Sequence, residues 1–146
     1  MNKFGFPGAS GGEKEKTVAP LISIVDDDAS VRRSTARVLR SVGLRAEAFA
    51  SAEEFLASKE VETTDCMILD LRMPGMSGLE LQRHLARVSN PVPIIFFSAH
   101  SSPKEERQLL RENTFQFLQK PVSKDVLLTA IRNVIKIWPK DERNIL

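Results

Sequence analysis

Short apolar runs alternate with amphipathic segments along most of this chain. Runs of about five mainly apolar residues are typical of strands inside a sheet, whereas apolar residues spaced three or four apart are typical of helices. The clearest run of the first kind is Ile94–Phe97, which is apolar at every position. Five such runs are predicted to be strands, at 21–25, 44–49, 67–69, 94–97 and 115–118, and the third ends at Asp70.

A helical segment follows each run, and residues of the capping type mark where the helices begin. The first helix is expected at about 29–42, with Asp28 as its N-cap and Gly43 directly after its end. Three capping boxes of the Ser-x-x-Glu type are expected to open the second, third and fourth helices of the chain. The fourth helix should cover about residues 103–112. These boxes begin at Ser51, Ser77 and Ser102, and Ser123 is expected to cap the last helix.

Strand and helix therefore alternate five times, which predicts an α/β fold. Such alternation is typical of a doubly wound parallel sheet with helices on both faces. We expect one domain over residues 20–138 and a short C-terminal tail over 139–146. Residues 1–19 hold four of the seven glycines and a Glu/Lys run, so they are expected to form a flexible N-terminal tail.

Composition narrows the classes of function. Hydrophobic residues make up 42% and charged residues 27% of the chain, as in ordinary globular domains. A formal net charge of +2 gives no support for binding to nucleic acid or to a membrane surface. The N-terminus has no secretory pattern, and the single Cys66 cannot form an internal disulfide, so we expect a cytoplasmic protein in which Cys66 is a buried apolar residue.

Polar residues follow or end four of the five predicted strands. Because the carboxyl ends of parallel strands meet at one edge of the sheet, these side chains are expected to converge where such sheets bind ligands. They are Asp26, Asp27 and Asp28 after the first strand, Asp70 at the end of the third, Ser98 after the fourth and Lys120 after the fifth.

This combination of residue types suits phosphoryl chemistry. Gathered carboxylates repel one another unless a cation lies among them, and oxygen ligands without a His or Cys cluster suit Mg²⁺. A carboxylate can accept a phosphoryl group, and a hydroxyl and an ammonium group can bind its charged oxygens. An acidic triplet alone is more often a turn that caps a helix, so the prediction of a phosphoryl-transfer site depends on the whole set.

Four segments of the chain resemble the receiver domains of bacterial two-component response regulators, and the fixation/nitrate-type subfamily looks most similar. The resemblance covers about residues 20–137. The separations of 44 residues from Asp26 to Asp70, 28 from Asp70 to Ser98 and 22 from Ser98 to Lys120 are also similar to those of the family. The segments are Ile24–Asp28, Leu69–Gly78, Phe97–His100 and Phe117–Pro121.

The resemblance implies a flavodoxin-like (βα)5 fold with strand order 2-1-3-4-5. It implies that Asp70 is the phosphoacceptor, with Ser98 and Lys120 binding the phosphoryl group. It also implies a Mg²⁺ site made by Asp26, Asp27, Asp70 and the backbone carbonyl of Arg72.

The same resemblance implies a conformational switch. Ser98 would move to the phosphoryl group, and Phe117 would turn inward to fill the space left behind. The peptide bond between Lys120 and Pro121 is expected to be cis, as in relatives. His100, two residues after Ser98, is expected at the lip of the site.

The implied role is signalling rather than enzymatic turnover, apart from self-catalysed phosphorylation and dephosphorylation. A sensor histidine kinase or a phosphotransfer protein would supply the phosphoryl group. A downstream protein or a second copy of the chain would read it through the face formed by the fourth helix, fifth strand and fifth helix. No direct contact with nucleic acid or a membrane is expected.

Two alternatives stay open. The chain could be the receiver part of a longer DNA-binding regulator rather than a stand-alone receiver. Asp26–Asp28 also fits the start of haloacid-dehalogenase-type phosphatases, in which Asp26 would be the nucleophile and Asp28 the acid. Those enzymes usually need a late pair of acidic metal ligands, and only the scattered Asp125 and Asp141 are found here.

The chain departs from the family pattern before the fifth predicted strand. Relatives often have Ala-Gly-Ala where this chain has Glu112-Asn113-Thr114. Thr114 is bulkier than alanine and lies near the expected switch. The fourth predicted helix is unusually charged, which is consistent with an atypical partner.

Overall fold

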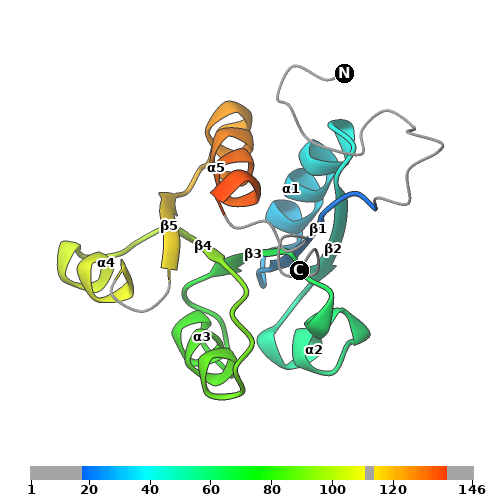
Figure 1. Ribbon diagram of the computed structural model, residues 1–146. Helices are drawn as coiled ribbons and strands as arrows, with labels where there is room; N and C mark the ends of the chain where they lie inside the picture. The colour runs from blue at the N-terminus through cyan, green and yellow to red at the C-terminus, as the bar shows by residue number, and fades with distance from the viewer. Residues whose placement is uncertain (1–17, 111–113, 138–146) are drawn as a thin grey trace.

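The computed structural model describes residues 18–110 and 114–137, and these form a five-stranded parallel sheet with a helix after each strand (Figure 1). The strand order is β2-β1-β3-β4-β5, which confirms the predicted fold class and order. The strands are β1 (Leu21–Val25), β2 (Arg45–Phe49), β3 (Cys66–Asp70), β4 (Ile94–Ser98) and β5 (Thr114–Gln119). The helices are α1 (Ala29–Ser41), α2 (Ala52–Leu56), α3 (Gly78–Arg87), α4 (Pro103–Leu110) and α5 (Lys124–Ile137).

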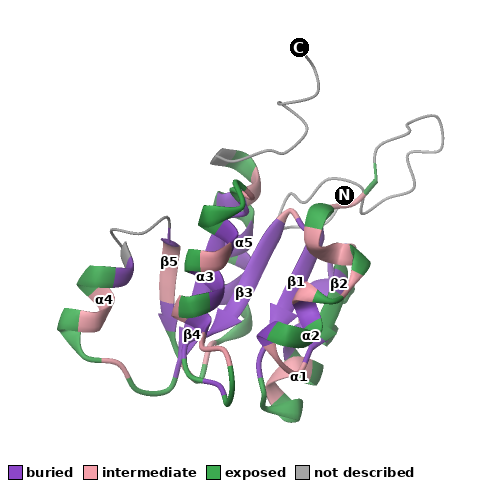
Figure 2. Cartoon of the chain, turned by 90° about the horizontal axis from the view of Figure 1, so that it is seen from below, coloured by how far each residue is buried: buried purple, intermediate pink, exposed green. Residues whose placement is uncertain are grey.

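The core lies in two layers, one on each face of the sheet. In Figure 1, α1 and α5 lie on one face, α2 and α3 lie on the other, and α4 lies beside the edge strand β5. Successive strand residues point to opposite faces, so Ile95 and Phe97 pack in one cluster and Ile94 and Phe96 in the other. Figure 2 shows that the buried residues follow the strands and the sides of the helices nearest to them.

The first helix begins and ends close to where the sequence predicts. The Asp28 carboxylate accepts hydrogen bonds from the backbone N–H groups of Ser30 and Val31, which confirms Asp28 as the N-cap. The helix ends at Ser41, one residue before the predicted end, and Gly43 takes the left-handed φ of 88° that suits a glycine after a helix.

The capping boxes differ in how completely they form. Ser77 and Glu80 make both reciprocal hydrogen bonds at the start of α3. The box predicted at Ser51 is only half formed, because the Glu54 carboxylate accepts from the N–H of Ala50 instead of from Ser51. The predicted cap of α2 by the Ser51 hydroxyl is therefore present, but the predicted hydrogen bond from the Ser51 N–H to Glu54 is not.

Some predicted boundaries fall outside the described residues. α4 is described as far as Leu110, so the predicted extension over 111–112 lies outside that part of the chain. The same holds for the predicted tails, except residues 18 and 19, and for residue 138. A short 3-10 helix at Lys59–Glu62 was not predicted, because four residues with one apolar position have no measurable period. Among the helices described, none combines the length and the apolar character needed to cross a bilayer.

Candidate functional site

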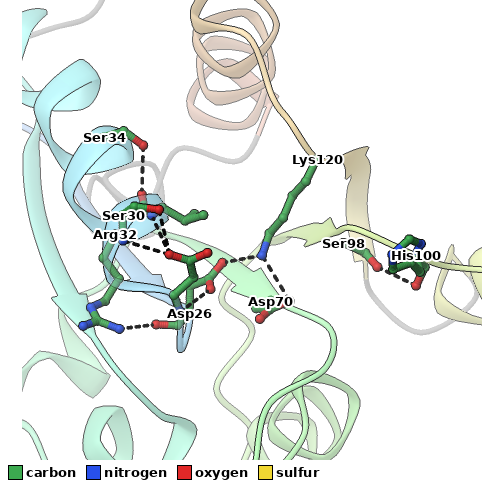
Figure 3. Close-up of polar contacts among 10 residues, drawn as sticks. Asp26, Ser30, Arg32, Ser34, Asp70, Ser98, His100 and Lys120 are labelled. Carbon is green, nitrogen blue, oxygen red and sulfur yellow. Dashed lines mark hydrogen bonds and ion pairs between the residues drawn. The ribbon is translucent and has the colours of Figure 1, made fainter.

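The polar residues predicted to converge do so at the carboxyl edge of the sheet (Figure 3). Asp26 directly follows β1, and Asp70 and Ser98 are the last residues of β3 and β4. Lys120 directly follows β5, and its backbone N–H donates to the carbonyl of Ser98 at 2.8 Å. Parallel pairing therefore brings together residues that lie far apart along the chain.

The acidic triplet divides between two tasks. Asp26, Asp27 and Asp70 each offer an oxygen that lies within 4.8 Å of the others. Asp26 and Asp70 are buried and Asp27 is exposed, whereas the Asp28 carboxylate caps α1. A set of three carboxylates fits a hard divalent cation such as Mg²⁺, since such ions prefer oxygen ligands.

Asp70 is held in surroundings that disfavour its charge. Burial, and then the nearby Asp26 carboxylate, raise the pKa of Asp70 from 3.8 to about 7, although Lys120 acts in the opposite direction. A divalent cation among these carboxylates would favour the ionised form. The electrostatics of Asp70 therefore support the same cation site as the donor set does.

The raised pKa of Asp70 predicts that the free energy of unfolding falls as the pH rises. The folded chain keeps this proton up to about pH 7, whereas the unfolded chain loses it near 3.8. Relative to an Asp70→Asn variant, the Mg²⁺-free chain should therefore lose stability between those values and then stay level. Allowing for partial solvent screening, we expect a total of about 1–3 kcal/mol.

Urea unfolding in EDTA at pH 4 and pH 8 measures this effect. The difference in the free energy of unfolding between the unmodified chain and Asp70→Asn should be near zero at pH 4 and largest at pH 8. A difference that does not change with pH would contradict the raised pKa.

Lys120 lies between the two buried carboxylates. Its Nζ is 2.9 Å from Asp26 Oδ2 and 3.6 Å from Asp70 Oδ1. Figure 3 marks both contacts with dashed lines. Burial works to lower the pKa of Lys120, but the bond to Asp26 and the charges of both carboxylates outweigh it and raise the pKa. The peptide bond between Lys120 and Pro121 is cis, as predicted. The structure thus presents a cation beside the predicted phosphoacceptor.

Ser98 is directed away from Asp70. Its hydroxyl donates to the backbone carbonyl of His100 at 2.9 Å, and the side chain is buried (Figure 3). His100 itself is exposed, in agreement with its predicted place at the lip of the site. To reach a group on Asp70, Ser98 would have to give up the His100 carbonyl.

The predicted switch aromatic lies on the edge strand β5, which pairs with β4. Phe117 is half-buried and stacks on Phe96 with ring centroids 6.3 Å apart. Its side chain belongs to the cluster on the side of α2 and α3. Space for an inward turn would therefore have to open on that side of the sheet.

The loop after β3 is fixed by contacts that the sequence did not indicate. The Glu53 carboxylate of α2 accepts from the backbone N–H of Met76 at 2.9 Å. Gly78, which opens α3, lies so close to β3 that an added Cβ would be 2.2 Å from the Asp70 carbonyl oxygen. Only glycine fits that approach, so the resemblance at Gly78 has a steric reason.

Arg72 joins this loop to the start of α4. Its guanidinium contacts both carboxylate oxygens of Glu105, at 2.6 and 2.7 Å, and its Nε donates to the His100 carbonyl at 3.4 Å. Glu105 also accepts from the backbone N–H of Ser102, while the Ser102 hydroxyl accepts from the Glu105 N–H. One carboxylate thus completes a capping box and an ion pair at the same time.

We expect Arg72 and Glu105 to be energetically coupled. Both side chains are partly exposed and solvent screens their attraction, so the coupling in the free energy of unfolding should be small but measurable. A double-mutant cycle with Arg72→Gln and Glu105→Gln measures it by urea unfolding. Glu105→Gln should cost more than Arg72→Gln, because it also weakens the cap of α4. Strictly additive effects would show that the ion pair contributes nothing.

Comparisons with known proteins agree with this geometry. The family model described as response regulator receiver domain matches residues 22–132. The chain is 37% identical over 139 residues to the response regulator protein TmoT of Ectopseudomonas mendocina, covering 95% of this chain and 63% of that protein. It is 40% identical over 121 residues to nodulation protein W of Bradyrhizobium diazoefficiens, covering 83% of this chain and 53% of that protein.

Solved structures show the same fold. The response regulator StyR matches with a TM-score of 0.78 and 37% identity, covering 86% of this chain and 63% of that chain. The FixJ-N structure matches with a TM-score of 0.72 and 31% identity, covering 82% of this chain and 96% of that one. The present chain thus spans between half and two-thirds of the length of the first curated relatives.

Proposed function

The chain belongs to the response regulator receiver domain family, and on that premise we propose that it carries its signal as a phosphoryl group on Asp70. The observation that carries this proposal is the position of Asp70. Its carboxylate is grouped with those of Asp26 and Asp27 and lies 3.6 Å from the ammonium of Lys120. Asp28, which the phosphatase alternative requires as an acid, is engaged in capping α1.

Mg²⁺ is the cofactor that we propose for this site. Asp26, Asp27, Asp70 and the backbone carbonyl of Arg72 would hold it. When bound, Mg²⁺ would offset the negative charge on the phosphoryl oxygens. The grouping of the three carboxylates and the raised pKa of Asp70 support this assignment.

In the proposed reaction, a carboxylate oxygen of Asp70 forms a bond to phosphorus. The bond between phosphorus and the donor's leaving atom breaks, and the donor keeps that electron pair. Lys120 would exchange part of its interaction with Asp26 for a phosphoryl oxygen. Ser98 would release the His100 carbonyl and donate to another phosphoryl oxygen, and Phe117 would respond by turning inward. Loss of the Ser98–His100 bond is thus the first structural consequence that we propose.

Mapping the label tests the assignment directly. The chain is incubated with acetyl phosphate and Mg²⁺, reduced with borohydride at the acyl phosphate, digested and analysed by mass spectrometry. We expect one modified peptide, with the change at Asp70, and no modification in EDTA. A label at Asp26 would instead support the phosphatase alternative.

We propose that Lys120 is needed for the conformational change that follows phosphorylation, and not for attachment of the phosphoryl group to Asp70. Lys120→Ala should still accept the phosphoryl group, but its amide shifts on phosphorylation should be much smaller than those of the unmodified chain. Two-dimensional NMR with acetyl phosphate measures both properties. Lys124→Ala, at an exposed position of α5, is the matched control and should respond fully. A full response in Lys120→Ala would contradict this role.

The proposed partners follow from the family. Receivers of this family take the phosphoryl group from histidine kinases, and a kinase or phosphotransfer protein is the donor that we propose here. We propose the face of α4, β5 and α5 for a downstream protein or a second copy. The exposed Val126 on α5 supports an apolar contribution from that face. A cytoplasmic location is part of the same proposal, since a receiver meets its kinase there.

A second candidate is a receiver within a longer transcriptional regulator. The support is the length of the relatives, since the chain covers 52% of the transcriptional regulatory protein TdiR of Thauera aromatica at 38% identity. Sequencing the gene on both sides of this segment tests it. An adjoining DNA-binding domain would support this candidate, and stop codons close to both ends would rule it out.

A further inference from the structure

A cavity of about 480 Å³ opens at the amino edge of the sheet. The second half of α3, residues 89–93 and the first residues of β4 and β5 form its walls. Strand β4 runs from Ile94 at the cavity to Ser98 at the carboxyl edge, which is about 13 Å at roughly 3.3 Å per residue. The cavity is therefore separate from the proposed phosphoryl site.

The walls of the cavity are mainly apolar. Leu85, Val92 and Ile94 are buried, and Phe115 is half-buried. The register between β4 and β5 shifts here: Ile94 pairs with Thr114 and Ile95 with Gln116, so Phe115 is an extra residue on β5. A bulge of this kind bends the strand that carries it, which helps to explain the space at its start.

One wall contains the buried side-chain amide of Gln82, whose N–H group is hydrogen-bonded and whose carbonyl oxygen is not. Gln82 is only 3% exposed, on a face of α3 that otherwise buries Leu81 and Leu85. Its Nε2 donates to the Thr114 hydroxyl at 2.8 Å. Its carbonyl oxygen has no hydrogen-bond donor among residues 18–110 and 114–137. Burying such an oxygen without a donor costs free energy that a suitable donor would recover.

We propose that this cavity binds a compact, flat, apolar molecule that carries one N–H or O–H group for the Gln82 carbonyl. The volume lies in the range of small-molecule pockets, and apolar walls with few polar groups are typical of them. No described residue that lines the cavity is charged, so these walls offer a charged ligand no opposite charge. The apolar walls give affinity, and Gln82 gives orientation.

Binding at this position would act on the strand that leads to the proposed phosphoryl site. Thr114 begins β5 at the cavity, and Lys120 follows β5 at the opposite edge of the sheet. A bound molecule would contact Thr114 and Phe115 and thereby brace this strand. The proposal itself concerns binding and does not depend on phosphorylation.

Indole and indene test the proposal, because they have nearly the same shape and differ in the N–H group. Each is titrated into the isotope-labelled chain while the Gln82 side-chain amide and the Thr114 backbone amide are followed by NMR. We expect saturable shifts at both signals, with indole bound roughly 2- to 10-fold more tightly than indene. Absence of saturable shifts, as expected if water alone fills the cavity, would overturn the proposal. Equal affinity for the two molecules would do the same.

Two variants separate binding in the cavity from binding elsewhere. Gln82→Met removes the hydrogen-bond acceptor but keeps a side chain of similar length, so the affinity for indole should fall to that for indene. Gln108→Met, at an exposed position of α4, is the control and should still bind indole more tightly than indene. Ala86→Phe, at an exposed position on the cavity wall, should weaken both ligands by filling the space without altering Gln82. Circular dichroism establishes that each variant is folded. Unchanged indole binding in Ala86→Phe would overturn the proposal even if Gln82→Met failed to fold.

Discussion

Replacing Asp70 by asparagine should abolish covalent labelling by acetyl phosphate. Asparagine keeps nearly the same volume at the end of β3, but its amide has no carboxylate oxygen that can attack phosphorus. Since Asp70 is buried beside Asp26 and Lys120, the substitution removes the proposed nucleophile without opening a cavity. We expect labelling below the detection limit of intact-protein mass spectrometry, whereas the unmodified chain gains one phosphoryl group.

The loss at Asp70 must be distinguished from general damage. Asp125→Asn changes an exposed carboxylate in the first turn of α5 and should be labelled like the unmodified chain. Asp70→Asn should also unfold at no lower urea concentration than the parent in EDTA at pH 8, because it removes a disfavoured charge. Undiminished labelling of a folded Asp70→Asn would place the phosphoacceptor elsewhere.

Replacing Asp27 by alanine should weaken Mg²⁺ binding by at least about tenfold. Asp27 is the exposed member of the three grouped carboxylates and would supply one oxygen ligand at the proposed Mg²⁺ site. Changes to groups that merely support a metal ligand commonly reduce affinity by about 10- to 100-fold, and loss of a direct ligand should not cost less. Isothermal titration with MgCl₂ measures the dissociation constant.

The adjacent Asp28 provides a matched control for this experiment. Asp28→Ala removes a carboxylate one residue away, but one that caps α1. We expect it to lower the free energy of unfolding, because the helix loses its N-cap, and to leave Mg²⁺ affinity nearly unchanged. If Asp28→Ala weakened Mg²⁺ binding as much as Asp27→Ala, the division of the triplet into metal ligand and helix cap would be wrong.

Local signals explain why much of the fold could be predicted. The apolar run Ile94–Phe97 and the cap at Asp28 depend on neighbouring residues, so a one-dimensional pattern contains them. Pairing of strands depends on residues far apart, and the order of the strands was therefore available only through the family resemblance. The approach of Lys120 to Asp70 was predicted without the resemblance, because parallel strands all end at the same edge of a sheet.

Contacts between exposed or isolated polar residues could not be predicted. Arg72 and Glu105 are 33 residues apart and lie in no periodic pattern, so nothing along the chain relates them. Gln82 stands between apolar helix positions and interrupts the pattern instead of contributing to it. The bulkier Thr114, a departure from the family pattern, has a structural partner in Gln82 that only the folded chain reveals. This departure from the family pattern thus pointed to a contact that is particular to this chain.

The shared carboxylate of Glu105 has a mechanical consequence. A side chain bonded at once to the loop after β3 and to the first turn of α4 acts as a common pivot for both segments. The loop after β3 and the first turn of α4 cannot move far apart without breaking a hydrogen bond to Glu105. The two segments are therefore less free to move independently than two loops without such a link. Movement that starts at either side of the Asp70 site should therefore be transmitted to the beginning of α4 as a correlated displacement.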